Sequence, residues 1–131
     1  MPWTGSLVVG GGAAIGAWLR WGLGILFNPL FPTLPLGTLG ANLIGGLLMG
    51  CAMEVLDRHA VLAPEVRLLV TTGFLGGLTT FSTFSGEVVT LLLRREYLWG
   101  ALAIAAHLVG SLALTIAGLL LVRALYAMAA S

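Results

Sequence analysis

Long apolar stretches dominate this chain, and short polar connections separate them. Four of the stretches reach about the 20 residues that an α-helix needs to cross a hydrocarbon core. The connections hold most of the charges and prolines, which end helices. The pattern predicts an all-α integral membrane protein, a single domain over residues 1–131, whose four transmembrane helices lie near 5–27, 36–55, 66–93 and 98–125.

Glycines and polar residues interrupt the third predicted span. Six hydroxyl or carboxyl side chains lie within residues 79–87, directly after Gly76 and Gly77. Paired glycines followed by threonines are poor helix formers, so we expect the backbone to unwind near residues 76–80. Free carbonyls are costly in lipid, so such a break must face protein, water or an ion. A purely structural kink is the alternative.

Two pairs of side chains leave this break on neighbouring helix faces. Phe81 and Phe84 are three residues apart, as are Ser82 and Ser85, so the members of each pair share a face. Apolar stripes usually serve packing. A phenylalanine ring edge, however, carries partial positive charge and can face an anion, so spacing alone leaves both roles open.

The second and fourth spans supply further polar stripes at helical spacing. Thr38 and Asn42 are four residues apart, and so are successive members of the set His107, Ser111 and Thr115. A hydroxyl in a membrane helix often bonds its own backbone, and a buried histidine is often simply hydrogen-bonded. We expect these residues to line a polar path, in which the Asn42 amide suits a small, hydrated anion.

Two ionisable residues lie within spans, a placement that is expensive and by default functional. Arg20 is the only charge in the first span, where it either serves function or extends toward the nearer interface. Glu87 follows Phe84 by three residues, so we expect it near the same face, as a candidate gate.

Composition supports the membrane assignment and excludes several classes of protein. With 59% apolar and 8% charged residues and a mean hydropathy of +1.06, the chain lacks the polar surface of a soluble globule, and lipid is its expected surrounding. Six arginines and no lysine are too few for a nucleic-acid surface. No nucleophile, base and orienting group can be placed together, so we expect no enzyme. Cys51 is alone and cannot form an intrachain disulfide.

The arginines also bear on orientation in the membrane, because Arg and Lys favour the cytoplasmic side. The side of the predicted termini carries three arginines, and the other side carries three when Arg20 is included: Arg58, Arg67 and Arg123 against Arg20, Arg94 and Arg95. This balance predicts dual topology, in which copies insert both ways and pair as an inverted dimer.

These motifs resemble those of the Fluc fluoride channels, also called the CrcB family, over essentially the full length. The first-span motif is Gly11, Gly12, Gly16, Ala17 and Arg20, and the second is Gly37, Thr38 and Leu39 with Asn42, Gly45 and Gly50. The most specific stretch is the third-span sequence from Gly73 to Ser85 with Glu87, GFLGGLTTFSTFS followed by GE.

The resemblance implies a fluoride-selective passive channel that lets fluoride leave the cytoplasm of a bacterial cell through the inner membrane. It further implies an antiparallel homodimer with two pores. The carbonyls of Gly76 and Thr79 from both subunits would hold a structural sodium ion. Phe81 and Phe84 would present ring edges to fluoride, Asn42 would donate from its amide, and the polar track beside them would comprise Thr38, Ser82, Ser85, Ser111 and Thr115.

Two features depart from the family pattern. His107 stands where other members tend to place a hydroxyl, and Gly40 and Ala41 stand where bulkier residues are common. A rival interpretation is a small inverted-dimer multidrug transporter, but such exporters resemble one another in having a glutamate in span one, which is lacking here. A non-conducting assembly subunit would leave the polar stripes unexplained.

Overall fold

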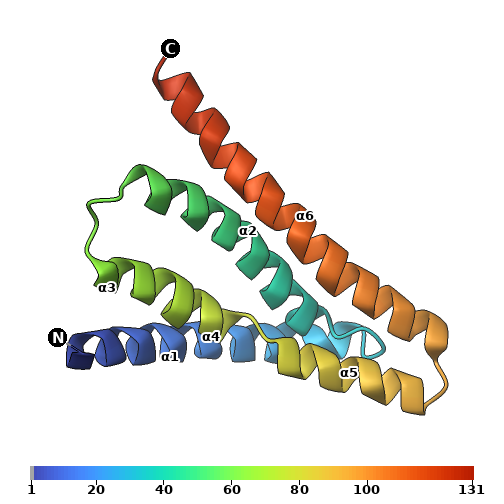
Figure 1. Ribbon diagram of the computed structural model, residues 1–131. Coiled ribbons are helices and arrows are strands. Elements are labelled where there is room, and N and C mark those ends of the chain that lie inside the picture. Colours follow the sequence, from blue (N-terminus) through green and yellow to red (C-terminus); the bar gives the residue numbers. More distant parts are fainter. Residues whose placement is uncertain (1) are drawn as a thin grey trace.

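The computed structural model describes residues 2–131, so Met1 of the predicted domain lies outside it. Every regular element in this range is helical. In chain order they are α1 (Pro2–Phe27), η1 (Asn28–Leu30), α2 (Leu36–Arg58), α3 (Pro64–Arg67), η2 (Leu68–Leu75), α4 (Gly76–Leu78), α5 (Phe81–Leu93) and α6 (Tyr97–Ala129). In Figure 1 both termini and the α2–α3 connection lie toward one end of the bundle, and the other two connections lie toward the opposite end.

Three helices within residues 2–131 are long and apolar enough, by length and composition, to cross a membrane. They are Trp3–Leu30, Leu36–Arg58 and Tyr97–Ala129, and they cover the first, second and fourth predicted spans. The third predicted span is divided among α3, η2, α4 and α5, which follow one another along the bundle (Figure 1). The chain is thus an all-helical, multi-pass membrane protein.

The break in the third segment is shorter than the sequence predicts. Only Thr79 and Thr80 are extended, with φ/ψ of −90°/155° and −148°/115°. The predicted unwinding at Gly76 and Gly77 is wrong, because both residues belong to the helical turn α4. The position of Gly77 explains its lack of a side chain: a Cβ there would overlap the backbone carbonyl of Ala13 in α1. Close helix packing, rather than unwinding, requires this glycine.

Two pairs of glycines four residues apart, Gly12 with Gly16 and Gly46 with Gly50, lie at helix contacts. Gly12 and Gly16 of α1 face the third segment, where a Cβ on Gly12 would lie 2.9 Å from the Leu69 carbonyl oxygen. Gly46 and Gly50 of α2 face α6 in the same way, and α2 and α6 run side by side in Figure 1. Small residues therefore set the distance between helices in both pairs.

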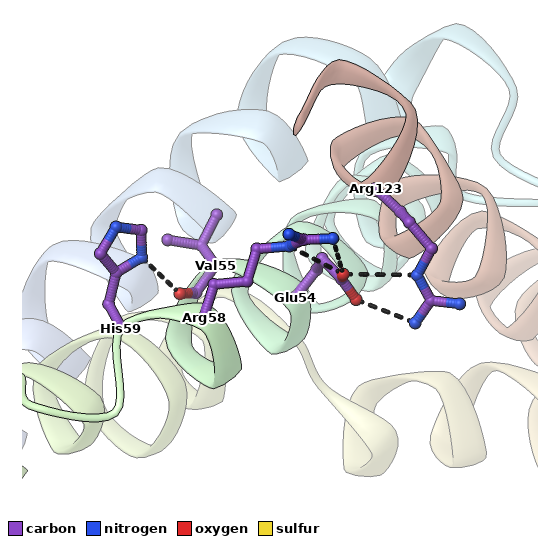
Figure 2. Close-up of polar contacts among 5 residues, drawn as sticks. All are labelled: Glu54, Val55, Arg58, His59 and Arg123. Carbon is purple, nitrogen blue, oxygen red and sulfur yellow. Dashed lines mark hydrogen bonds and ion pairs between the residues drawn. The ribbon is translucent and has the colours of Figure 1, made fainter. Parts of the chain in front are cut away.

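An ion-pair cluster joins the C-terminal parts of α2 and α6 (Figure 2). The Glu54 carboxylate accepts from Arg58 one turn later, with an ion-pair distance of 2.9 Å, and from Arg123 of α6 at 3.0 Å. Arg58 also lies over the ring of Tyr126, 4.4 Å from its centroid. The cluster ties the C-terminal part of α6 to α2 at the end of the molecule that holds both termini.

Candidate functional site

A cavity of about 410 Å³ lies between α2, the interrupted third segment and α6. Its lining is mostly apolar, and it contains eight of the residues that the sequence singles out: Asn42, Gly76, Thr79, Phe81, Phe84, His107, Ser111 and Thr115. Ligand sites in proteins typically combine such an apolar wall with a few polar groups. Residues from three predicted spans thus meet at one place, whereas spacing alone could only put them on one face of each helix.

Asn42 holds the extended backbone of the break from α2. Its Oδ1 accepts from the Thr80 amide at 2.7 Å, and its Nδ2 donates to the Thr80 carbonyl at 3.0 Å. The same Nδ2 lies 2.9 Å from His107 Nδ1. A primary amide has two N–H donors, so both hydrogens of Asn42 are engaged. In this arrangement Asn42 fixes the break and has no free hydrogen for an anion.

The break also releases backbone carbonyls from their helical partners, and those of Gly76 and Thr79 are two of them. In a continuous helix, the amides of Thr80 and Thr83 would donate to the carbonyls of Gly76 and Thr79. Here the Thr80 amide donates to Asn42, and the Thr83 amide donates to the Thr80 hydroxyl at 3.1 Å, which caps α5. Gly76 and Thr79 are the residues that the family resemblance assigns to a cation.

The two phenylalanines of the site differ in exposure. Phe84 is 5% exposed, whereas Phe81 is 70% exposed. Their rings make an edge-to-face contact with centroids 5.4 Å apart. Phe84 also stacks on the His107 imidazole at a centroid distance of 4.5 Å. Phe84 is therefore fixed between two rings, while Phe81 presents most of its surface outside the chain.

His107 is 3% exposed and has one buried nitrogen without a partner. Because Nδ1 accepts from the Asn42 amide, the proton of the neutral ring resides on Nε2. Among residues 2–131, Nε2 is the buried side-chain polar atom that makes no hydrogen bond. Leaving a buried donor unpaired costs about 1–3 kcal/mol, so this nitrogen calls for an explanation.

The hydroxyls of the predicted polar track donate to backbone carbonyls. Thr115 Oγ1 lies 2.9 Å from the carbonyl oxygens of Gly46 and of Ser111, and Ser111 Oγ donates to the Asn42 carbonyl at 3.5 Å. Ser85 Oγ donates to the Phe81 carbonyl at 2.9 Å. A hydroxyl has a single hydrogen. These three hydroxyls can therefore donate to another acceptor only after they rotate away.

The remaining predicted residues lie beside the cavity rather than along its wall. Thr38 Oγ1 donates to Glu87 Oε2 at 2.7 Å and joins α2 to α5. Ser82 is exposed, and its hydroxyl lies 3.3 Å from that of Thr80. Arg20 Nε donates to the Gly77 carbonyl at 3.1 Å, so the guanidinium bonds to the turn before the break instead of extending to an interface.

Asn28 is one residue of this region that sequence reasoning missed. Its Oδ1 accepts from the amides of Gly37 and Thr38, at 2.8 and 3.1 Å. It thereby caps the start of α2 from nine and ten residues away and holds Thr38 in place for Glu87. A capping residue is normally sought directly before its helix. The intervening proline-rich loop therefore conceals this one in the sequence.

Comparison with known proteins identifies the chain's relatives. The family model described as "CrcB-like protein, Camphor Resistance (CrcB)" matches residues 7–119. A protein of Nitrosospira multiformis is 61% identical over 115 residues, which cover 88% of this chain and 90% of the relative. One from Ralstonia pickettii is 61% identical over 123 residues, covering 94% and 98%. Both are named fluoride-specific ion channel FluC, which is the name of a channel and not of an enzyme. The chain belongs to the CrcB-like protein family.

Proposed function

We propose that this protein is a passive, fluoride-selective channel of a bacterial inner membrane that exports cytoplasmic fluoride. The observation that carries the proposal is the cavity, where a largely apolar wall meets phenylalanine rings and a buried histidine beside a broken helix. Relatives named fluoride-specific ion channels, 61% identical over 88% or more of this chain, support the choice of ion.

The phenylalanine rings fit the chemical demand that fluoride makes. A pore for a tightly hydrated ion must replace its water without holding the ion too firmly. Ring edges carry partial positive charge and bind weakly. Phe84 is fixed and buried, and Phe81 is mostly exposed, so the two rings form successive contacts from outside the chain toward its interior. The serines and threonines beside them add donors that must rotate to act.

The residues at the break fit the structural sodium ion that the family resemblance implies. Gly76 and Thr79 line the cavity, and the amides that would occupy their carbonyls in a helix are engaged elsewhere. Within residues 2–131 no group of three or more His, Cys, Asp or Glu side chains gathers to bind a metal. Backbone carbonyls are hard ligands suited to a hard cation such as Na⁺. When bound, sodium would neutralise these carbonyl dipoles and fix the break.

An antiparallel homodimer with two pores accounts for the surface that the single chain leaves uncovered. Phe81 is 70% exposed although it lines the cavity, and Phe31, Leu108 and Leu112 are also partly exposed apolar residues. A second copy that covers the open side would complete the cavity wall and supply the other two carbonyls for sodium. The near balance of arginines favours insertion in both orientations.

Fluoride efflux from proteoliposomes tests the channel. We expect passive fluoride efflux, negligible chloride efflux, and a loss of about tenfold or more in Phe81→Ile, since each ~1.4 kcal/mol added to a barrier slows passage tenfold. Phe27→Ile is the control, because Phe27 ends α1 and is outside the cavity lining. Efflux that requires a proton gradient, or equal rates for chloride, would contradict the proposal.

A further inference from the structure

The hydrogen bonds around Asn42 raise the question of which donor could bind an anion in the part of the cavity next to Asn42. Asn42 donates one hydrogen to the Thr80 carbonyl and the other to His107 Nδ1. An anion could use the Asn42 amide only by breaking a contact that holds the helix break. The free donor beside Asn42 is therefore on a different residue.

His107 has that donor. The ring is 3% exposed, its Nδ1 accepts from Asn42, and its Nε2–H is buried without a hydrogen-bond partner among the residues that the structure describes. The ring lines the cavity and stacks on Phe84, the buried phenylalanine of the site. Buried donors are nearly always satisfied in native proteins, so an unsatisfied one beside a cavity points to a ligand.

The surroundings favour a small anion as this ligand. The Glu87 carboxylate accepts from the Thr38 hydroxyl and is not among the residues that line the cavity. Because Nε2 is almost fully covered, an ion that reaches it must lose water, and a donor N–H offsets part of that loss. Fluoride is small and a strong hydrogen-bond acceptor, whereas chloride is larger and accepts more weakly.

We propose that the Nε2–H of His107 binds fluoride directly, while Asn42 acts as the positioning residue that orients the ring and clamps Thr80. This inference rests on the proposed function and deepens it. It assigns the anion contact in this part of the cavity to the imidazole of His107 in α6 rather than to the amide of Asn42 in α2.

NMR of the full chain in proteoliposomes, labelled with ¹⁵N at histidine, tests the contact. The sequence has only two histidines, so the exposed His59, whose Nδ1 bonds the Val55 carbonyl, is an internal control, and His59→Gln assigns the signals. We expect the His107 Nε2–H proton signal to move downfield and saturate with sodium fluoride. It should remain in place with sodium chloride at equal ionic strength, and His59 should respond to neither salt.

A signal that ignores fluoride and shows exchange with water would overturn the inference, because water would then occupy the site. Fluoride efflux measured on the same proteoliposomes separates a failure of the histidine contact from a failure of the proposed channel function. Efflux without a fluoride-dependent His107 signal contradicts the histidine contact alone. A saturable signal without efflux supports the contact and contradicts the channel.

Two substitutions divide the roles of the ring nitrogens. His107→Asn places an acceptor near the position of Nδ1 but has no group at Nε2, whereas His107→Gln can place an amide donor near Nε2. We expect fluoride affinity to fall roughly ten- to hundredfold in His107→Asn, the value of a hydrogen bond to a charged group, and to be largely retained in His107→Gln. Equal affinity in His107→Asn and the natural chain would overturn the inference.

Discussion

Asn42 determines the shape of the site at the scale of single residues. Its amide bonds both the N–H and the C=O of Thr80, so it supplies the partner that the Thr80 N–H loses at the break and adds a bond to the carbonyl of this N-cap residue. Arg20 bonds the backbone before the break, where its Nε donates to the Gly77 carbonyl. Both residues satisfy backbone groups that would be costly in an apolar surrounding.

Asn42→Leu should therefore destabilise the extended backbone of the break and also impair fluoride passage. The substitution leaves the Thr80 N–H and His107 Nδ1 without these partners, at about 1–3 kcal/mol for each buried group, and removes one bond to the Thr80 carbonyl. We expect faster hydrogen exchange at the Thr80 amide together with a loss of fluoride efflux. Thr90→Ala is the control, since the exposed Thr90 hydroxyl bonds only the Gly86 carbonyl and lies outside the site. Lost efflux with unchanged exchange would show that Asn42 is a ligand and not a clamp.

At the scale of elements, glycines decide how closely the helices approach. α2 and α6 meet where Gly50 faces Thr115 and Gly118 faces Leu47, each glycine directly against a carbonyl of the other helix. This contact brings the Thr115 hydroxyl to within 2.9 Å of the Gly46 carbonyl. It also brings His107 of α6 within reach of Asn42. The geometry of the site thus depends on the close packing of α2 and α6 at Gly50 and Gly118, which lie farther along the two helices.

Gly50→Ala tests this dependence. A Cβ at Gly50 would overlap the Thr115 carbonyl and lie 2.8 Å from the Leu119 amide, so the helices must separate. We expect a loss of about 1–3 kcal/mol, typical of overpacking, observed as a lower Tm of the purified protein. Gly40→Ala of the same helix should change Tm little, because a Cβ there meets nothing within 4 Å. Equal Tm values for both variants would refute the packing argument.

At the scale of the whole molecule, the charges are concentrated at its two ends. Arg58 and Arg123 share Glu54 at the end with both termini, and Arg94 and Arg95 lie at the other end. The hydrogen bond of Arg20 to Gly77 holds it at the break, which leaves three arginines against two. A difference of one residue is a weak signal for orientation. It is compatible with the proposed antiparallel pair.

Removal of sodium tests this assembly. If the carbonyls of Gly76 and Thr79 from two chains hold Na⁺, its replacement by a large organic cation leaves those dipoles facing one another. We expect the detergent-purified dimer to dissociate at higher protein concentrations in sodium-free buffer, as measured by light scattering or cross-linking. Unchanged dimerisation would contradict the central cation.

The orientation of the two copies is tested separately, in intact cells. A protease-sensitive tag on the C-terminus should be cleaved from outside in about half of the copies in intact cells if the pair is antiparallel. Cleavage of all copies or of none would show a single orientation and contradict dual topology. Together the two measurements separate the loss of the ion from the loss of the inverted arrangement.

The sequence by itself determined the class of protein, the approximate position of each helix and the existence of a break in the third segment. These features depend on local hydrophobicity, on glycine and on helical spacing, which act over a few residues. The resemblance in the GFLGGLTTFSTFS stretch also pointed to the family to which the chain belongs. The sequence predicted unwinding over residues 76–80, of which only Thr79 and Thr80 are extended.

Only the tertiary structure decided what the polar side chains do. Spacing put Asn42 and His107 on helix faces, but their mutual contact, and the use of both Asn42 hydrogens, depends on how α2, α5 and α6 meet. Position 77 requires glycine because Ala13, more than sixty residues away, leaves no room for a side chain. Hydrogen bonds between distant segments have no local pattern in the chain, and the donor left unpaired on His107 emerges only when these bonds are in place.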